Sequence, residues 1–305
     1  MAAKRGISVK DLYGGRFISP EAAGRSMVAL EKRLTTEFNE RTRLRKQFTE
    51  PAQKLIAPLL SGSNLEREAT AAARAMQRLQ KVARGLKVQR LRPVKVNTGI
   101  FTGLTGAIVS APFDYQWTWG AVSGDDPHDN SETADRGSGD LAIVLNTGID
   151  DSSSAAGRAA VGIYFYPPTS TGILQVWSTP ALNYLWGTYC SFDSAHADGW
   201  IAMYVGSYNL AGAFTGAVID QRTTLWSDDS WFHGNSGNFP TASYGLHPAP
   251  IQVDRQHQYI IWVWCGGEVS ADGWHLLNGS GAMDQLYIAV PSITWEFWPV
   301  FVFEP

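Results

Sequence analysis

The lysines and the tryptophans of this chain occupy separate segments. Every lysine lies at or before Lys95, whereas the first of the 12 tryptophans is Trp117. Residues 1–100 carry 21 Lys and Arg against 8 Asp and Glu, a net charge of +13, and the rest of the chain carries 4 Arg against 20 acids, a net charge of −16. This asymmetry indicates two parts with different roles, a basic arm and an acidic head.

The amino-acid composition changes near residues 20, 93 and 101. We therefore divide the chain into an irregular basic arm (1–19), a helical arm (20–92), a linker (93–100) and a tryptophan-rich β domain (101–305). The opposite charges fit a basic arm that meets an acidic partner. They fit equally an arm that contacts the acidic head, within one chain or between copies.

The first part of the helical arm predicts a helix over about 20–50. Ser19 suits the N-cap position, Pro20 the first turn, and Glu21 the positive end of the helix dipole. Pro51 is expected to end or kink this helix. Apolar residues spaced by threes and fours form one seam, which Glu37 and Arg41 interrupt: Met27, Leu30, Leu34, Leu44 and Phe48.

A second helix is expected over about 64–90, and its seam has no interruption. The seam alternates steps of four and three through Leu65, Ala69, Ala72, Met76, Leu79, Ala83 and Leu86. Such a pattern is typical of a coiled coil. Two arrangements remain open: the helix assembles with copies of itself as a stalk, or the two helices form a hairpin that packs on the β domain.

The basic faces of these helices limit the partners of the arm. A basic amphipathic helix can lie on an anionic membrane surface, so this partner stays open. Nucleic acid is not the expected partner, because no aromatic residue interleaves with the basic face and no zinc-finger or basic-zipper motif is present. The pattern favours a homo-oligomer.

The acidic part predicts an antiparallel β-sandwich or jelly-roll-like domain. Gly, Ser, Asn and Asp clusters separate short runs of β-branched and aromatic residues, without a competing helical period. The fold class is therefore α+β in segregated parts. The expected strands include residues 141–147, 159–166, 172–177, 200–207, 212–219, 257–265, 285–290 and 293–303.

Two cysteines, Cys190 and Cys265, are too few for a disulfide scaffold or a four-cysteine zinc site. One disulfide or two buried free thiols are both open. Each cysteine precedes an Ala-Asp-Gly-Trp segment, at 197–200 and 271–274, which suggests an Asp-Gly turn in two equivalent hairpins.

Two polar segments are candidates for binding. The acidic segment 124–132 offers Asp125, Asp126 and Asp129 to a hard cation such as calcium, although a solvated surface loop explains it better. A loop-like segment sets aromatic rings beside polar groups, as sugar sites do. Its candidate residues are Trp226, Asp228, Asp229, Trp231, His233, Asn235 and Asn238.

Catalytic signatures are absent: the chain has no nucleophile elbow, no HExxH segment and no Walker loop. We expect no enzyme and no cofactor. The leading hypothesis is a recognition or structural protein of a larger particle, such as a fibre or an injection machine, whose β head binds a glycan or protein receptor. The alternatives are a soluble toxin with membrane-active helices and a carbohydrate-active enzyme.

The N-terminus carries positive charge without a following apolar run, so no secretory signal is expected. No segment reaches the roughly 18–20 apolar residues that span a bilayer as a helix. We expect cytoplasmic synthesis, followed by incorporation into a particle or release by another route.

Overall fold

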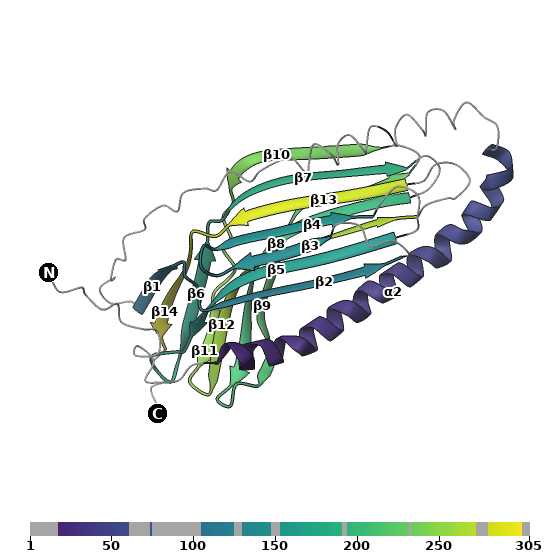
Figure 1. Cartoon of the computed structure of the whole chain (residues 1–305). Coiled ribbons are helices and arrows are strands. Elements are labelled where there is room, and N and C mark those ends of the chain that lie inside the picture. Colours follow the sequence, from purple (N-terminus) through teal and green to yellow (C-terminus); the bar gives the residue numbers. More distant parts are fainter. Residues whose placement is uncertain are drawn as a thin grey trace.

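The computed structural model describes residues 18–60, 74, 105–124, 130–147, 153–190, 194–231, 234–272 and 280–300. These residues form one long helix, α2 (Pro20–Leu60), and antiparallel β-sheets arranged as a sandwich (Figure 1). The β-sandwich predicted from the strand pattern is thus confirmed, whereas the coiled-coil seam from Leu65 to Leu86 lies outside the described residues. Among the described residues, no helix is long and apolar enough to cross a membrane.

Two five-stranded sheets form the body of the sandwich. The covered sheet has the order β2 (Tyr115–Ser123), β5 (Ser153–Phe165), β12 (His257–Ala271), β8 (Ser194–Asn209) and β9 (Phe214–Trp231). The facing sheet has the order β10 (Asn235–Ser243), β7 (Ala181–Cys190), β13 (Ser280–Ala289), β4 (Asp140–Asn146) and β3 (Ser131–Asp135). Aliphatic residues of both sheets meet between them as the main core.

A third sheet, the end sheet, continues the facing sheet at one end. Its order is β1 (Thr105–Ser110), β14 (Ser292–Pro299), β6 (Thr171–Ser178) and β11 (Ile251–Asp254). Strand β6 leads into β7 across a break at Pro180, and β13 leads into β14 across a break at Pro291. Proline has no backbone N–H, so a ladder breaks readily at these points and the layer can bend.

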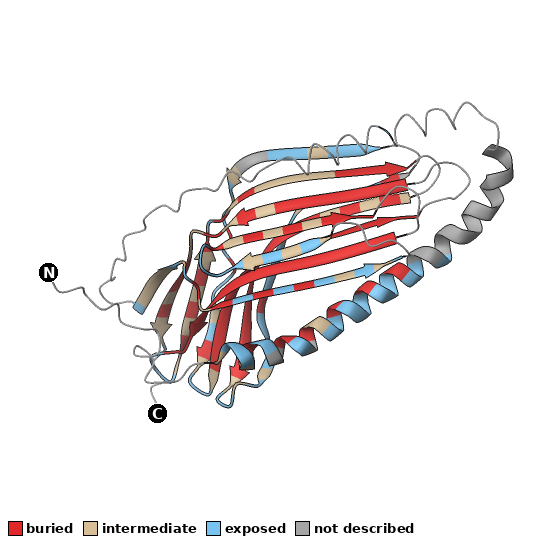
Figure 2. Ribbon diagram, in the orientation of Figure 1, coloured by how far each residue is buried: buried red, intermediate tan, exposed pale blue. Residues whose placement is uncertain are grey.

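The central strands β5 and β12 of the covered sheet are buried on both faces, which Figure 2 shows as continuous red, whereas the edge strands β2 and β9 have exposed residues. Alternate residues of a strand point to opposite faces. Along β12, Ile261, Val263 and Cys265 point into the main core, whereas Trp262 and Trp264 point to the outer face. This double burial explains why the sequence of β12 is apolar without alternation.

Helix α2 covers the outer face of this sheet. Its buried seam consists of Ala23, Met27, Leu30, Leu34 and Phe38, packed against the tyrosines and tryptophans of β2, β8 and β12. In Figure 2, the buried positions form a stripe along the helix that faces the sheet. The apolar stripe that the sequence shows is therefore a sheet contact over this part of the arm.

Side-chain hydrogen bonds fix the register between α2 and β2. Trp117 Nε1 donates to Glu31 Oε1 over 2.9 Å, and Trp119 Nε1 donates to Thr35 Oγ1 over 3.3 Å. Two residues of a strand rise by about 6.7 Å and four residues of a helix by about 6 Å. The two spacings match, so helix and strand run side by side.

The N-terminus of the helix forms as the sequence predicts. Ser19 Oγ accepts the backbone N–H of Ala22 over 3.1 Å, which is N-cap geometry. The phenol of Tyr115 donates to the Ile18 carbonyl over 2.6 Å and joins this cap to β2.

Three expectations from the sequence were wrong. The helix does not end near residue 50 but continues through Pro51 and Pro58 to Leu60. Leu44 is 39 % exposed and does not belong to the seam, because the buried stripe passes from Leu34 to Phe38 instead. The expected turn at Asp198 lies inside β8, where backbone pairing with β12 overrides the local Asp-Gly preference.

The helix contact predicts unequal costs for two leucines of α2. Leu34 is 2 % exposed and Leu44 is 39 % exposed. Leu34→Ala should lower the free energy of unfolding by about 2–5 kcal/mol, because it leaves a cavity against the aromatic face. Leu44→Ala, the matched control, should stay within about 0.5 kcal/mol. Equal effects in urea unfolding would contradict the packing of α2.

Candidate functional site

The segment 226–240 was expected as a loop, but residues 226–231 form the end of β9 and residues 235–240 belong to β10. Strand alternation divides its polar residues between two faces. Asp228 pairs with Ala197 and points toward the sandwich interior, whereas Asp229 pairs with His196 on the outer face of the covered sheet. The sequence did not predict these strands, because Asp, Ser and Asn have low strand propensity.

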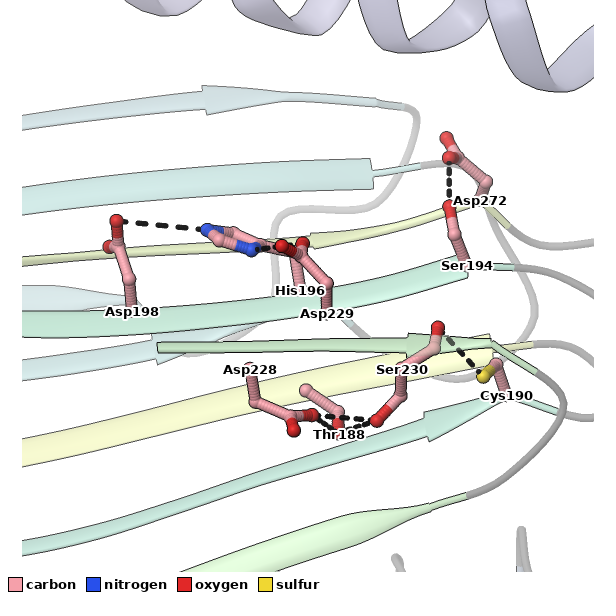
Figure 3. Close-up of polar contacts among 9 residues, drawn as sticks. All are labelled: Thr188, Cys190, Ser194, His196, Asp198, Asp228, Asp229, Ser230 and Asp272. Carbon is pink, nitrogen blue, oxygen red and sulfur yellow. Dashed lines mark hydrogen bonds and ion pairs between the residues drawn. The ribbon is translucent and has the colours of Figure 1, made fainter. Parts of the chain in front are cut away.

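Asp228 joins strands of two different sheets. Its Oδ2 accepts hydrogen bonds from Thr188 Oγ1 at 2.5 Å and from Ser230 Oγ at 2.6 Å (Figure 3). Its Oδ1 accepts a hydrogen bond from Asn235 Nδ2 at 2.9 Å. Thr188 lies on β7 and Asn235 on β10, so this carboxylate links the edge of the covered sheet to the facing sheet.

A row of aromatic rings extends from the same edge toward solvent. Trp226 stacks on Tyr184 with ring centroids 4.5 Å apart, and Tyr184 stacks on Phe239 at 5.4 Å with an interplanar angle of 9°. Trp226 is buried and its ring fills the space above Gly199, whereas Phe239 is 42 % exposed. Trp226 therefore supports the outer rings from beneath.

The aromatic row and the Asp228 cluster lie on the same inner faces of β7, β9 and β10. We call this surface the edge strip: Tyr184, Thr188, Trp226, Asp228, Asn235 and Phe239. Sequence reasoning missed Tyr184 and Phe239, because β7 and β10 come together only in the folded sheet. Asn238 pairs with Leu185 on the opposite face, so it does not join the strip.

Asp229 belongs to a second polar group on the outer face of the covered sheet. His196 Nδ1 lies 2.7 Å from Asp229 Oδ1, and His196 Nε2 lies 3.7 Å from Asp198 Oδ2, as Figure 3 shows. Burial by itself would raise the pKa of Asp198, but the contact with His196 and the charges of Arg158 and Arg41 lower it below its usual value.

A buried arginine lies next to this group, beneath the helix. The Arg158 guanidinium sits between two indole rings, 5.5 Å from the Trp119 centroid and 4.9 Å from the Trp200 centroid. Its Nη1 donates to the carbonyls of Gly157 and Gly267, each over 2.6 Å. These cation–π and hydrogen-bond contacts replace part of the lost hydration.

Acidic neighbours keep Arg158 charged at neutral pH. Burial lowers its pKa to about 10, against the opposing effect of Glu268 and Asp198. Glu268 Oε2 also pairs with Arg41 Nη2 of α2 at 3.0 Å, and their side chains are 2 % and 47 % exposed. This ion pair is a direct contact between the basic arm and the acidic head, which the charge asymmetry allowed.

The two cysteines are free thiols and both are buried, so of the two open alternatives the free-thiol state is present. Cys190 Sγ donates to the Ser230 carbonyl at 3.1 Å. Burial raises the pKa of the Cys265 thiol well above its usual value, so it stays protonated and unreactive.

Several candidate residues fall outside what the structure describes. They are Asp125, Asp126, Asp129 and His233, together with the side chain of Trp231. Within the described ranges, no group of three His, Cys, Asp or Glu residues could hold a metal ion. Calcium binding by the 124–132 segment therefore stays a prediction.

Comparison with known proteins does not assign the chain to a family. No family model matches it, and no curated protein matches it. Solved structures with partial likeness include a CocE/NonD family hydrolase from Staphylococcus aureus (8 % identity, 55 % of this chain and 37 % of that chain, TM-score 0.21).

Two further structures belong to the same range of similarity. One is a family 11 carbohydrate-binding module from Clostridium thermocellum in complex with a mixed-linked tetrasaccharide (8 % identity, 65 % and 93 % coverage, TM-score 0.16). The other is the enzymatically active domain of bacteriophage CBA120 tailspike protein 4 (15 % identity, 65 % and 21 % coverage, TM-score 0.15). The chain spans about a third of the hydrolase and a fifth of the tailspike domain. At these TM-scores, none of the three supports an argument about function.

The ion pair between Glu268 and Arg41 predicts an asymmetry between its two partners, because only Glu268 is buried. Glu268→Ala should lower the free energy of unfolding by about 3–5 kcal/mol, because it leaves the buried Arg158 short of negative charge. Arg41→Ala should cost only about 1 kcal/mol, since Arg41 is half exposed and Glu268 keeps Arg158 as a neighbour. Guanidinium unfolding of both variants checks this order, and a reversed order would contradict the cluster.

Proposed function

We propose that the chain is a non-enzymatic recognition protein whose β-sandwich head binds carbohydrate at the edge strip. The observation that carries this proposal is the row of stacked rings from Trp226 through Tyr184 to the exposed Phe239, beside the polar group around Asp228. Sugars bind where an aromatic face meets the apolar side of a pyranose and polar groups meet its hydroxyls.

The strip has the rigidity that recognition needs. Its outer rings rest on the buried Trp226, and Asp228 is held by side chains from β7, β9 and β10. A ligand would therefore meet groups that are already ordered, which lowers the entropy cost of binding. Asn235 and Phe239 are exposed at the two ends of the strip and would make its first contacts.

The negative charge of the head determines which glycans we expect to bind. The head carries 4 Arg against 20 acids, so anionic sugars approach an unfavourable field. The expected ligand is a neutral glycan or one that bears an amine. We also propose that the arm binds protein partners or packs into a larger particle. The described residues favour neither the toxin nor the glycosidase alternative over carbohydrate recognition.

A glycan array of neutral, amine-bearing and acidic glycans tests the strip. Phe239→Ala should weaken binding by up to about tenfold, because an aromatic contact contributes about 0.5–1.5 kcal/mol, whereas Phe239→Trp should retain binding. Leu210→Ala, at another exposed apolar position, is the control and should bind like the unmodified protein. Unchanged binding by Phe239→Ala and Tyr184→Ala, or a preference for acidic glycans, would refute the proposal.

The arm is proposed to assemble the heads through the seam from Leu65 to Leu86. Full-length protein should then be a discrete oligomer by light scattering, and Met76→Glu with Leu79→Glu should reduce its subunit number, because charges at core positions disrupt a coiled coil. A monomeric full-length protein would show that the seam is satisfied within one chain.

A further inference from the structure

Asp284 carries a carboxyl group in the interior of the sandwich, and no described residue is its hydrogen-bond partner. It lies on β13 between Leu145 of β4 and Trp186 of β7, and it is 0 % exposed. Neither of its carboxyl oxygens accepts or donates a hydrogen bond within the part of the chain that the structure describes. Buried polar groups without partners are rare in folded proteins, and each one calls for a physical explanation.

The Asp284 carboxyl lies close against the backbone of β12. A Cβ placed on Gly267 of β12 would lie 2.1 Å from Asp284 Oδ2, so the carboxyl occupies the position that a side chain would need. The Cα atoms of β12 and β13 approach within 8 Å, closer than the roughly 10 Å typical of stacked sheets. The carboxyl is therefore enclosed by close-packed strands.

The charges near Asp284 are already balanced without it. Arg158 and Asp198 act on it through the covered sheet, and the Cys265 thiol lies nearby on β12. On the outer face, Arg158, Arg41 and Arg222 are positive, and Glu268, Asp198 and Asp220, which pairs with Arg222, are negative. The direct strand neighbours of Asp284, Leu145 and Trp186, are uncharged. An ionised Asp284 would add a further negative charge to this set, and Arg158, the cation that acts on it, is already shared with Glu268 and Asp198.

We propose that Asp284 is a proton lock: the folded head holds this side chain as the neutral acid at neutral pH, and loss of the proton weakens the contact between β12 and β13. Burial raises the pKa of Asp284 well above its usual value, with a further increase from Asp198 and a partial opposing effect of Arg158. The lock is independent of the carbohydrate proposal, because it concerns the stability of the sandwich alone.

The sign of the pH effect follows from linkage. The unfolded chain releases the Asp284 proton near pH 3.9, whereas the folded head keeps it to higher pH. The native protein then binds one more proton than the unfolded chain, so the stability that Asp284 contributes is complete below about pH 3.9 and falls as pH rises toward the folded pKa. The loss reaches up to about tenfold in the folding equilibrium constant per pH unit.

Asp284→Asn tests the lock, because the amide is isosteric and cannot ionise. The measurement is the folding equilibrium constant of the variant divided by that of the unmodified protein, from urea unfolding at each pH unit between 4 and 9. This ratio should rise with pH by up to about tenfold per unit and level off at the folded pKa. Asp220→Asn, at a half-exposed position beside Arg222, is the control, and its ratio should not rise. A ratio for Asp284→Asn that does not change with pH would overturn the proposal.

Carboxyl-carbon NMR of the unmodified protein gives a second readout, which does not depend on whether the variant folds. With ¹³C-labelled aspartate, one aspartate signal should keep the chemical shift of a protonated acid at pH 7. If every aspartate signal shows the carboxylate shift at that pH, the lock does not exist.

Discussion

The fold depends on how the aromatic outer face of the covered sheet is buried beneath α2. Tyr115, Trp117, Trp262 and Trp264 would otherwise present a large apolar surface to water. Fully burying one large apolar side chain contributes about 1.5–3 kcal/mol, so the shared burial of these rings by the α2 seam is a major contribution to stability. The Trp117–Glu31 and Trp119–Thr35 hydrogen bonds then select one register of the helix among many apolar ones.

Burial of the central strands of the covered sheet on both faces also explains where the charges of the head lie. A strand covered on both faces has no solvated side, so any polar residue on it needs a partner or must lose its charge. Arg158 obtains partners through Trp119, Trp200 and Glu268, and Arg41 of the helix completes that group. Asp284, on the strand opposite, has no hydrogen-bond partner among the described residues. At one edge of the sandwich, β9 and β10 present the edge strip to solvent.

The sequence predicted the elements better than their contacts. Ser19 and Pro20 mark the helix start through local backbone chemistry, and the apolar run from Tyr259 to Cys265 predicts a strand, because both signals are contained in neighbouring residues. An amphipathic seam shows that one helix face is buried but not what covers it. For the same reason, the pairing of Tyr184 with Phe239 and the isolation of Asp284 could not be predicted, since both depend on strand order.

The central claim is that residues 20–42 of α2 are a structural layer of the head. Hydrogen–deuterium exchange of the full-length protein tests it most directly, because backbone amides exchange slowly only where the packed structure must open first. The account predicts that the amides of residues 23–42 exchange nearly as slowly as those of β12, and that Glu268→Ala accelerates exchange in both elements. Rapid exchange throughout residues 23–42, with slow exchange in β12, would contradict it.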